Sequence, residues 1–188
     1  MKIRYCSCSR CNRGDKIVNP YAPFEGDFSL NELKLEFDPR VHMFCRFGCG
    51  KFNSKPHCPP SIPHSSYYRE ALKEYHRAHV YARRYPYADG LFSEHWRGYS
   101  TNEIHHALLE HEMALFVKGH IYAKAFIGGS CKICMADACN ANRCNIPHRG
   151  RAALEATGLN VLSLLKNIGQ EYQDPPIDYF WRIGAVFY

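Results

Sequence analysis

Four cysteines lie within a single short stretch of this chain, at Cys131, Cys134, Cys139 and Cys144, in the spacing C-x2-C-x4-C-x4-C. Four thiolates held this closely would repel one another and oxidise unless a soft metal neutralised their charge. A zinc site usually separates two C-x2-C pairs by a longer loop, whereas a compact run of four cysteines is closer to the pattern that binds a 4Fe–4S cluster. The spacing therefore favours an iron–sulfur cluster, with structural zinc as the alternative.

A second group of three cysteines lies upstream, at Cys45, Cys49 and Cys58, and ends in a Cys-Pro-Pro sequence. Three thiols do not complete a four-ligand site. Either an N-terminal cysteine or a histidine supplies the fourth ligand, or the metal keeps an open position. The candidate histidines are His42, His57 and His64. Because open positions are typical of catalytic metal sites and closed ones of structural sites, this group raises the possibility of an enzyme.

Three more cysteines lie near the N-terminus, at Cys6, Cys8 and Cys11. They are candidate additional ligands for the second group. They are equally compatible with a separate ion or with free, unligated thiols. We assign residues 1–30 to a cysteine-containing N-terminal arm and residues 31–188 to a single metal-binding or iron–sulfur domain.

Composition bounds the class of protein. The chain has 188 residues, of which 46% are hydrophobic, enough for one domain with a core. No apolar run is long enough to cross a bilayer and the N-terminus lacks a signal-like apolar stretch, so we expect a cytoplasmic protein with no membrane partner. In that compartment clustered cysteines are ligands more often than disulfides. The net charge of +6 is modest and spread along the chain, which argues against a nucleic-acid partner.

Hydrophobic periodicity predicts an α+β fold with a central mixed sheet flanked by helices, and with the cysteine clusters on loops at strand ends. The predicted strands are 31–38, 41–44, 79–87, 121–127 and 178–188. The predicted helices are 65–76, 100–119 and 161–167, with a further helical turn at 152–156. We expect Gly128 and Gly129 to let the backbone approach the cluster sulfurs.

The predicted helix 100–119 carries three histidines and several glutamates. A di-iron bundle would need a second Glu-x-x-His motif, which the sequence lacks. We therefore expect His105, His106 and His111 to be polar or hydrogen-bonding residues, and Glu110 and Glu112 to lie on a solvated face.

Three blocks of sequence resemble a family of predicted metal-binding proteins, domain of unknown function 2284. The first runs from Val41 to Gly50 and continues to the Cys-Pro-Pro at Cys58. The second runs from Leu109 to Phe126, and the third from Gly129 through the four cysteines to Val161. This resemblance implies a metal or iron–sulfur site at Cys131, Cys134, Cys139 and Cys144, and another at Cys45, Cys49 and Cys58, but it implies no reaction.

These observations lead to one principal functional hypothesis and two alternatives. The principal hypothesis is a 4Fe–4S protein of anaerobic redox metabolism, an electron relay with one or two clusters and a redox protein as partner. The first alternative is an enzyme that uses an open three-cysteine cluster for sulfur transfer or dehydration. The second is a zinc-stapled binding module. The oligomeric state is not encoded in any of these patterns.

Overall fold

The computed structural model describes residues 22–87, 94–134 and 139–188, with residues 94–97 described by their backbone alone. Its sheet has the strand order β1-β2-β4-β3. The strands are β1 (Phe24–Ser29), β2 (Arg77–Pro86), β3 (Lys124–Phe126) and β4 (Tyr179–Phe187). The predicted α+β class is confirmed, but the three pairings between these strands are all antiparallel rather than mixed. Strand direction depends on how the connections run, which hydrophobic periodicity does not encode.

The helices are α1 (Leu30–Leu33), α2 (Pro39–Gly48), α3 (Ser65–Ala71), α4 (Glu94–Val117) and α5 (Val161–Asn167), with the 3-10 turns η1 (Leu72–Glu74) and η2 (Glu155–Thr157). The predicted strands 79–87 and 178–188 and the predicted helices 65–76, 100–119 and 161–167 correspond to β2, β4, α3 with η1, α4 and α5. The predicted strand 121–127 is shortened to β3. None of the helices in the described ranges combines the length and the apolar character needed to cross a bilayer.

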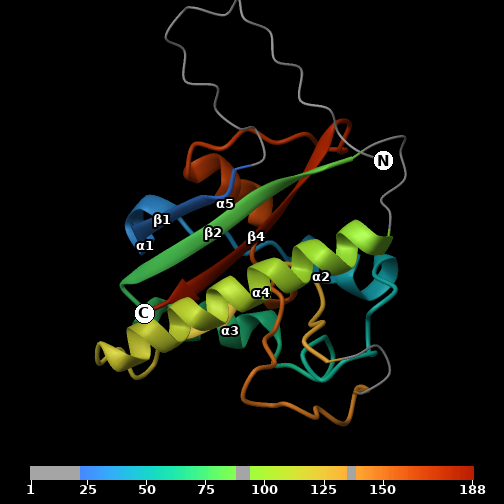
Figure 1. Cartoon of the computed structure of the whole chain (residues 1–188), viewed down its shortest axis with the longest axis horizontal. Coiled ribbons are helices and arrows are strands. Elements are labelled where there is room, and N and C mark those ends of the chain that lie inside the picture. Colours follow the sequence, from blue (N-terminus) through green and yellow to red (C-terminus); the bar gives the residue numbers. More distant parts are fainter. Residues whose placement is uncertain (1–21, 88–93, 135–138) are drawn as a thin grey trace, which may run out of the picture.

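The sheet separates two hydrophobic cores. Ala78, Val80 and Ala82 of β2 point into the core that α1, α3 and α5 cover, while Tyr81 points to the α4 side. This alternation is the two-residue period of a strand buried on both faces. Figure 1 shows α4 as the long helix running beside β2 and β4. Gly184 permits this approach, because a Cβ there would lie 2.4 Å from Leu108 Cδ1.

One predicted strand is helical in the structure and another is helical in its first residues, while Phe37 of the latter forms an isolated bridge with Leu159. Residues 31–38 begin with α1, whose N-terminus is a capping box in which Ser29 and Glu32 bond each other's backbone N–H groups. Residues 41–44 lie inside α2, which begins at Pro39 after the N-cap Asp38. In both places a local helix-start signal outweighs the short apolar alternation on which the strand predictions rested.

Strand β1 lies in the segment that the sequence assigns to the N-terminal arm. It pairs with β2 over Phe24–Ser29, so the last part of that segment belongs to the sheet. Where the domain begins upstream of β1 stays a prediction, because residues 1–21 lie outside the described ranges. The cysteines Cys6, Cys8 and Cys11 lie there too.

Candidate metal centre

The three-cysteine group extends from the end of α2 into the loop that follows it. Cys45 lies in the last turns of α2, Cys49 is the residue that caps its C-terminus, and Cys58 lies further along the loop. The prediction that both clusters lie on loops at strand ends is therefore wrong for this group, which follows a helix and has Cys45 inside it. The loop is braced internally, since the Asn53 N–H donates to the Pro59 carbonyl at 2.8 Å.

The four-cysteine group follows β3. Residue Ile127 forms a bridge with Ala153, and the Leu154 N–H donates to the Ile127 carbonyl at 2.7 Å. This bridge brings the segment after the cysteines back beside the first of them. Cys131 is 7% exposed, and its sulfur accepts hydrogen bonds from the backbone N–H groups of Ile133 and Arg151. Backbone donors aimed at sulfur are a recurrent feature of sites that hold thiolates to metal.

The two thiol loops contact each other directly. The Lys55 Nζ donates to Cys139 Sγ at 3.3 Å, and His57 Nε2 lies 3.3 Å from Cys144 Sγ. Ser61 Oγ also donates to the Ala141 carbonyl at 3.2 Å. In Figure 1 the teal loop after α2 and the orange loop after β3 accordingly lie side by side. Two cysteine groups that are far apart in sequence thus line one region of the molecule.

Burial and mutual repulsion raise the pKa values of several of these thiols. For Cys131 and Cys134 burial is the largest cause, followed for Cys134 by the neighbouring thiols of Cys139, Cys131 and Cys144. The two N–H donors to Cys131 oppose the rise without reversing it. The pKa values of Cys131 and Cys134 thus respond to the other thiols of the same run, as a shared centre requires.

The pKa values of two thiols in the three-cysteine group are raised further. Burial raises the pKa of Cys45 to about 11, with further contributions from Cys49 and Glu155. Burial raises the pKa of Cys58 to about 12, and Cys45, Cys49, Glu155 and Cys131 add to it. The Cys58 thiol is thus close enough to Cys131 for the two groups to interact. The seven cysteines in the described ranges all carry free thiols.

These shifts bear on whether the residues fit a metal. Without a cation, thiols with raised pKa values stay protonated and neutral at neutral pH, because their thiolate forms would be poorly solvated and would repel one another. A metal cation reverses this balance, because it favours the thiolate form and neutralises neighbouring charges. The donor set is also soft, which suits zinc and iron–sulfur clusters. The seven thiols therefore fit a metal centre.

The spacing of the sulfurs bears on the size of that centre. Four thiolates at about 2.3 Å from one tetrahedral zinc would lie about 3.8 Å apart. Within the described ranges, no three cysteine sulfurs lie within 4.8 Å of one another. The arrangement is therefore wider than a single zinc ion needs.

Three glycines show how tightly the residues around the centre are packed. A Cβ on Gly150 would lie 1.9 Å from His57 Nε2, so only glycine at 150 lets His57 reach Cys144. Gly128 packs against β4, because a Cβ there would meet the Ile183 carbonyl oxygen at 2.7 Å, and its approach to the cluster sulfurs stays a prediction. Gly129 donates its N–H to Glu155 Oε1 at 2.9 Å. These two glycines serve packing against β4 and the binding of a carboxylate.

Glu155 is a carboxyl group beside the three-cysteine group. Burial raises its pKa, although the Gly129 N–H and the positive charge of Arg182 favour the ionised form. Its charge in turn acts on the pKa values of Cys45 and Cys58. Glu155 is thus placed to hold a proton next to these thiols.

Several residues that shape the centre were not found by sequence reasoning. Lys55 lies between Cys49 and Cys58 but had no role in any motif, whereas His57 was a candidate fourth ligand for Cys45, Cys49 and Cys58 and in the structure contacts Cys144. Arg151 is 7% exposed, and its guanidinium is paired with Glu112 of α4, with Nε 2.9 Å from Oε2. The expected solvated position of Glu112 is therefore wrong. In the sequence, the only indication of this pair is that Arg151 follows the cysteine run, and nothing there links it to Glu112.

Comparison with known families gives a match over most of the chain. The family described as "Predicted metal-binding protein (DUF2284)" matches residues 29–187, which confirms the resemblance predicted from the three sequence blocks. No curated protein and no solved structure matches the chain. The assignment of individual cysteines as ligands stays a prediction.

Proposed function

Because the chain belongs to this family of predicted metal-binding proteins, we propose that it is an iron–sulfur protein whose two thiol loops hold one or two 4Fe–4S clusters for electron transfer. Cys131, Cys134, Cys139 and Cys144 would hold the first cluster. Cys45, Cys49 and Cys58 would hold the second, with Cys6, Cys8 or Cys11 as candidate additional ligands. We place this activity in anaerobic redox metabolism, in the cytoplasm, with a redox protein as partner.

The observation that carries this proposal is the spacing of the thiols. The cysteines converge, yet no three of their sulfurs in the described ranges lie within 4.8 Å of one another. A cluster of several irons spreads its thiolates more widely than one zinc ion does, so the spacing favours the cluster. When bound, such a cluster supplies reversible one-electron transfer.

The surrounding residues have clear roles toward such a cluster. The N–H groups of Ile133 and Arg151 bond the Cys131 sulfur, which stabilises its thiolate form. The Lys55 ammonium lies against Cys139 and offsets negative charge there. Hydrogen bonds and charges of this kind tune the reduction potential of iron–sulfur centres.

The test is purification of the full chain without oxygen, followed by iron, zinc and sulfide analysis and by EPR after reduction. We expect iron and sulfide in equal amounts and an EPR signal. Changing Cys134 and Cys139 to serine should remove the iron of one cluster and leave the rest. Changing Cys45 to serine should remove the remaining iron. A colourless protein with stoichiometric zinc would favour the zinc-stapled alternative and end the proposal.

A second function is favoured by Glu155. A carboxyl group with a raised pKa, next to a group of only three cysteines, is the arrangement expected of a cluster enzyme with an open position and a proton carrier. Sulfur transfer and dehydration are the reaction types we infer for it. Addition of cyanide or a small thiol should then alter the EPR signal that depends on Cys45. An unaltered signal would mean that a fourth protein ligand closes the site.

A further inference from the structure

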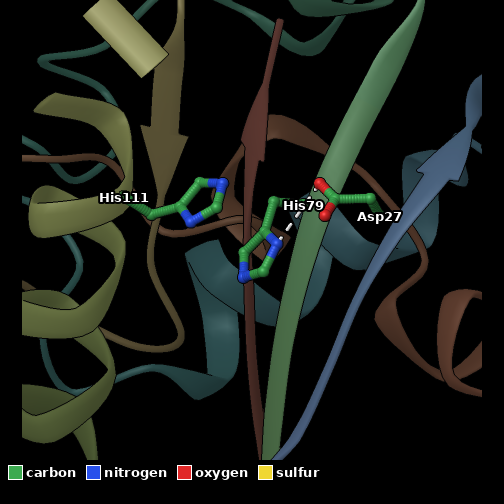
Figure 2. Close-up of side chains that lie close together, drawn as sticks. All are labelled: Asp27, His79 and His111. Atoms are coloured by element: carbon green, nitrogen blue, oxygen red, sulfur yellow. Dashed lines mark ion pairs between the residues drawn. The ribbon is translucent and has the colours of Figure 1, made fainter. Parts of the chain in front are cut away.

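Three potential metal ligands from three separate elements meet on the α4 side of the sheet, away from the cysteines. Asp27 of β1 lies directly opposite His79 of β2 in the strand register. His111 reaches toward them from α4, and Figure 2 shows all three side chains converging. Their ligand atoms lie within 4.8 Å of one another, which within the described ranges holds for no other group of histidine, cysteine or acidic residues.

His79 has an unsatisfied polar atom at the centre of this group. The residue is 8% exposed, and its Nδ1 is buried without a hydrogen-bond partner. Asp27 Oδ1 lies 3.3 Å from this nitrogen and forms an ion pair with it, although the contact does not have hydrogen-bond geometry. A buried nitrogen without a hydrogen-bond partner is unfavourable, so a native structure ordinarily supplies a partner for it.

The distances suit a small cation. Two ligand atoms at about 2.05 Å from a tetrahedral zinc ion lie about 3.3 Å apart, which matches the separation of His79 Nδ1 and Asp27 Oδ1. The rings of His79 and His111 are stacked, with centroids 3.6 Å apart and planes at 13°. Binding one ion with both rings requires His111 to rotate out of the stack, and its half-exposed place on α4 gives it room to do so.

The charges around the group also favour a cation. Glu25 Oε2 lies 4.0 Å from His79 Nε2, so a second carboxylate faces the imidazole. The Tyr188 hydroxyl donates to Asp27 Oδ1 at 2.9 Å, and Arg77 Nε donates to that hydroxyl at 3.3 Å. A hydrogen bond to a ligating carboxylate fixes its orientation, as is usual around protein-bound metals. Two cations lie nearby: Arg77 reaches Asp27 Oδ1 only through the Tyr188 hydroxyl, and the charge of Lys118 adds to burial and to His79 in lowering the pKa of His111.

We propose that Asp27, His79 and His111 bind a divalent transition-metal ion of the zinc class. Two imidazoles and one carboxylate form a borderline donor set that suits Zn²⁺, Fe²⁺ or Ni²⁺. Three protein ligands leave one position for water or a substrate, as in catalytic zinc sites. This second site is independent of whatever the cysteines hold.

The test is calorimetric titration of the full chain, purified without oxygen, with Zn²⁺ alone, while the iron and zinc content is measured before and after. We expect one equivalent of Zn²⁺ to bind without loss of the metal already present. Co²⁺ in its place should give visible bands without strong near-ultraviolet absorption from thiolate. Asp27→Asn and His111→Gln should each weaken this binding by about 100-fold or more.

The matched control is His76→Gln, which removes an exposed histidine that lies close to β2 in the chain but outside this group. Its affinity for Zn²⁺ should equal that of the unchanged protein. Circular dichroism and thermal unfolding establish that each variant folds. The proposal is overturned if no additional equivalent binds, if Zn²⁺ enters only by displacing metal from the thiols, or if folded Asp27→Asn and His111→Gln bind as the control does.

Discussion

The ion pair between Arg151 and Glu112 allows the packing beside the thiol centre to be tested quantitatively. The Arg151 and Glu112 side chains are 8% and 14% exposed. Glu112 Oε2 also accepts the Ala125 N–H at 2.6 Å, so one carboxylate ties α4 to β3 and to the segment after the cysteines. Glu112→Gln keeps the shape of this side chain and removes its charge, which leaves the Arg151 guanidinium buried without a counter-ion.

Removing one partner of a buried ion pair destabilises a protein by about 3–5 kcal/mol, because the remaining charge stays out of water. Since Glu112 retains some exposure, we expect the lower end, about 3 kcal/mol. For a chain of this length each kcal/mol lowers the melting temperature by about 2–4 °C, so the shift should be about 6–12 °C. Urea unfolding measures the free energy directly, and calorimetry measures the temperature.

The control is Glu70→Gln, which breaks the Lys73–Glu70 pair, whose side chains are 62% and 67% exposed. An exposed pair of this kind contributes about 0–1 kcal/mol. A double variant, Glu112→Gln with Arg151→Met, should be less destabilised than the sum of the two single variants, because no uncompensated charge remains. If Glu112→Gln loses no more free energy of unfolding than Glu70→Gln, the pair is not buried as described and this reasoning fails.

Three further predictions follow from single residues. Gly150→Ala should push His57 away from Cys144 and weaken metal retention by about tenfold in chelator competition, whereas Gly50→Ala, with nothing within 4 Å of the new Cβ, should not. Burial lowers the pKa of His105 from 6.5 to about 4, so the unfolded chain binds the extra proton and stability should fall by about 3 kcal/mol as pH drops from 6.5 to 4. His105→Gln should flatten that part of a pH series of urea unfolding curves, and an unchanged slope would contradict the assignment. Asn160→Ala should lower the free energy of unfolding by about 1 kcal/mol, because the Asn160 side chain accepts the Leu162 and Ser163 N–H groups at the start of α5; equal urea midpoints would speak against this cap.

Much of the fold follows from periodicity where an element is long. The helix that α4 forms was predictable from Ile104, Leu108 and Leu115, which share one face and are buried. Short elements were decided by caps instead. Ser29 with Glu32 begins α1 and Asp38 with Pro39 begins α2, and both signals stood in the sequence but were outweighed by alternation in the strand predictions.

The sites divide in the same way. The cysteine spacing predicts that neighbours such as Cys131 and Cys134 act together, because their contact is local. It does not predict that Cys58 lies near Cys131, since that depends on how the loops after α2 and β3 pack. The group of Asp27, His79 and His111 was likewise hidden, because it draws one residue from each of three elements and no two of its members are neighbours in sequence.

The bonds that join the two thiol loops have a consequence for how the protein acquires its metal. Lys55 and His57 dock the walls of the centre against each other through Cys139 and Cys144 without requiring an ion between them. A receptacle that is preorganised loses little conformational entropy on loading, so less of the binding energy is consumed in ordering the chain. Selectivity among competing metals then depends on the fixed separations of the donor atoms rather than on a folding event. An ion of the wrong size binds weakly, because the two loops do not rearrange around it.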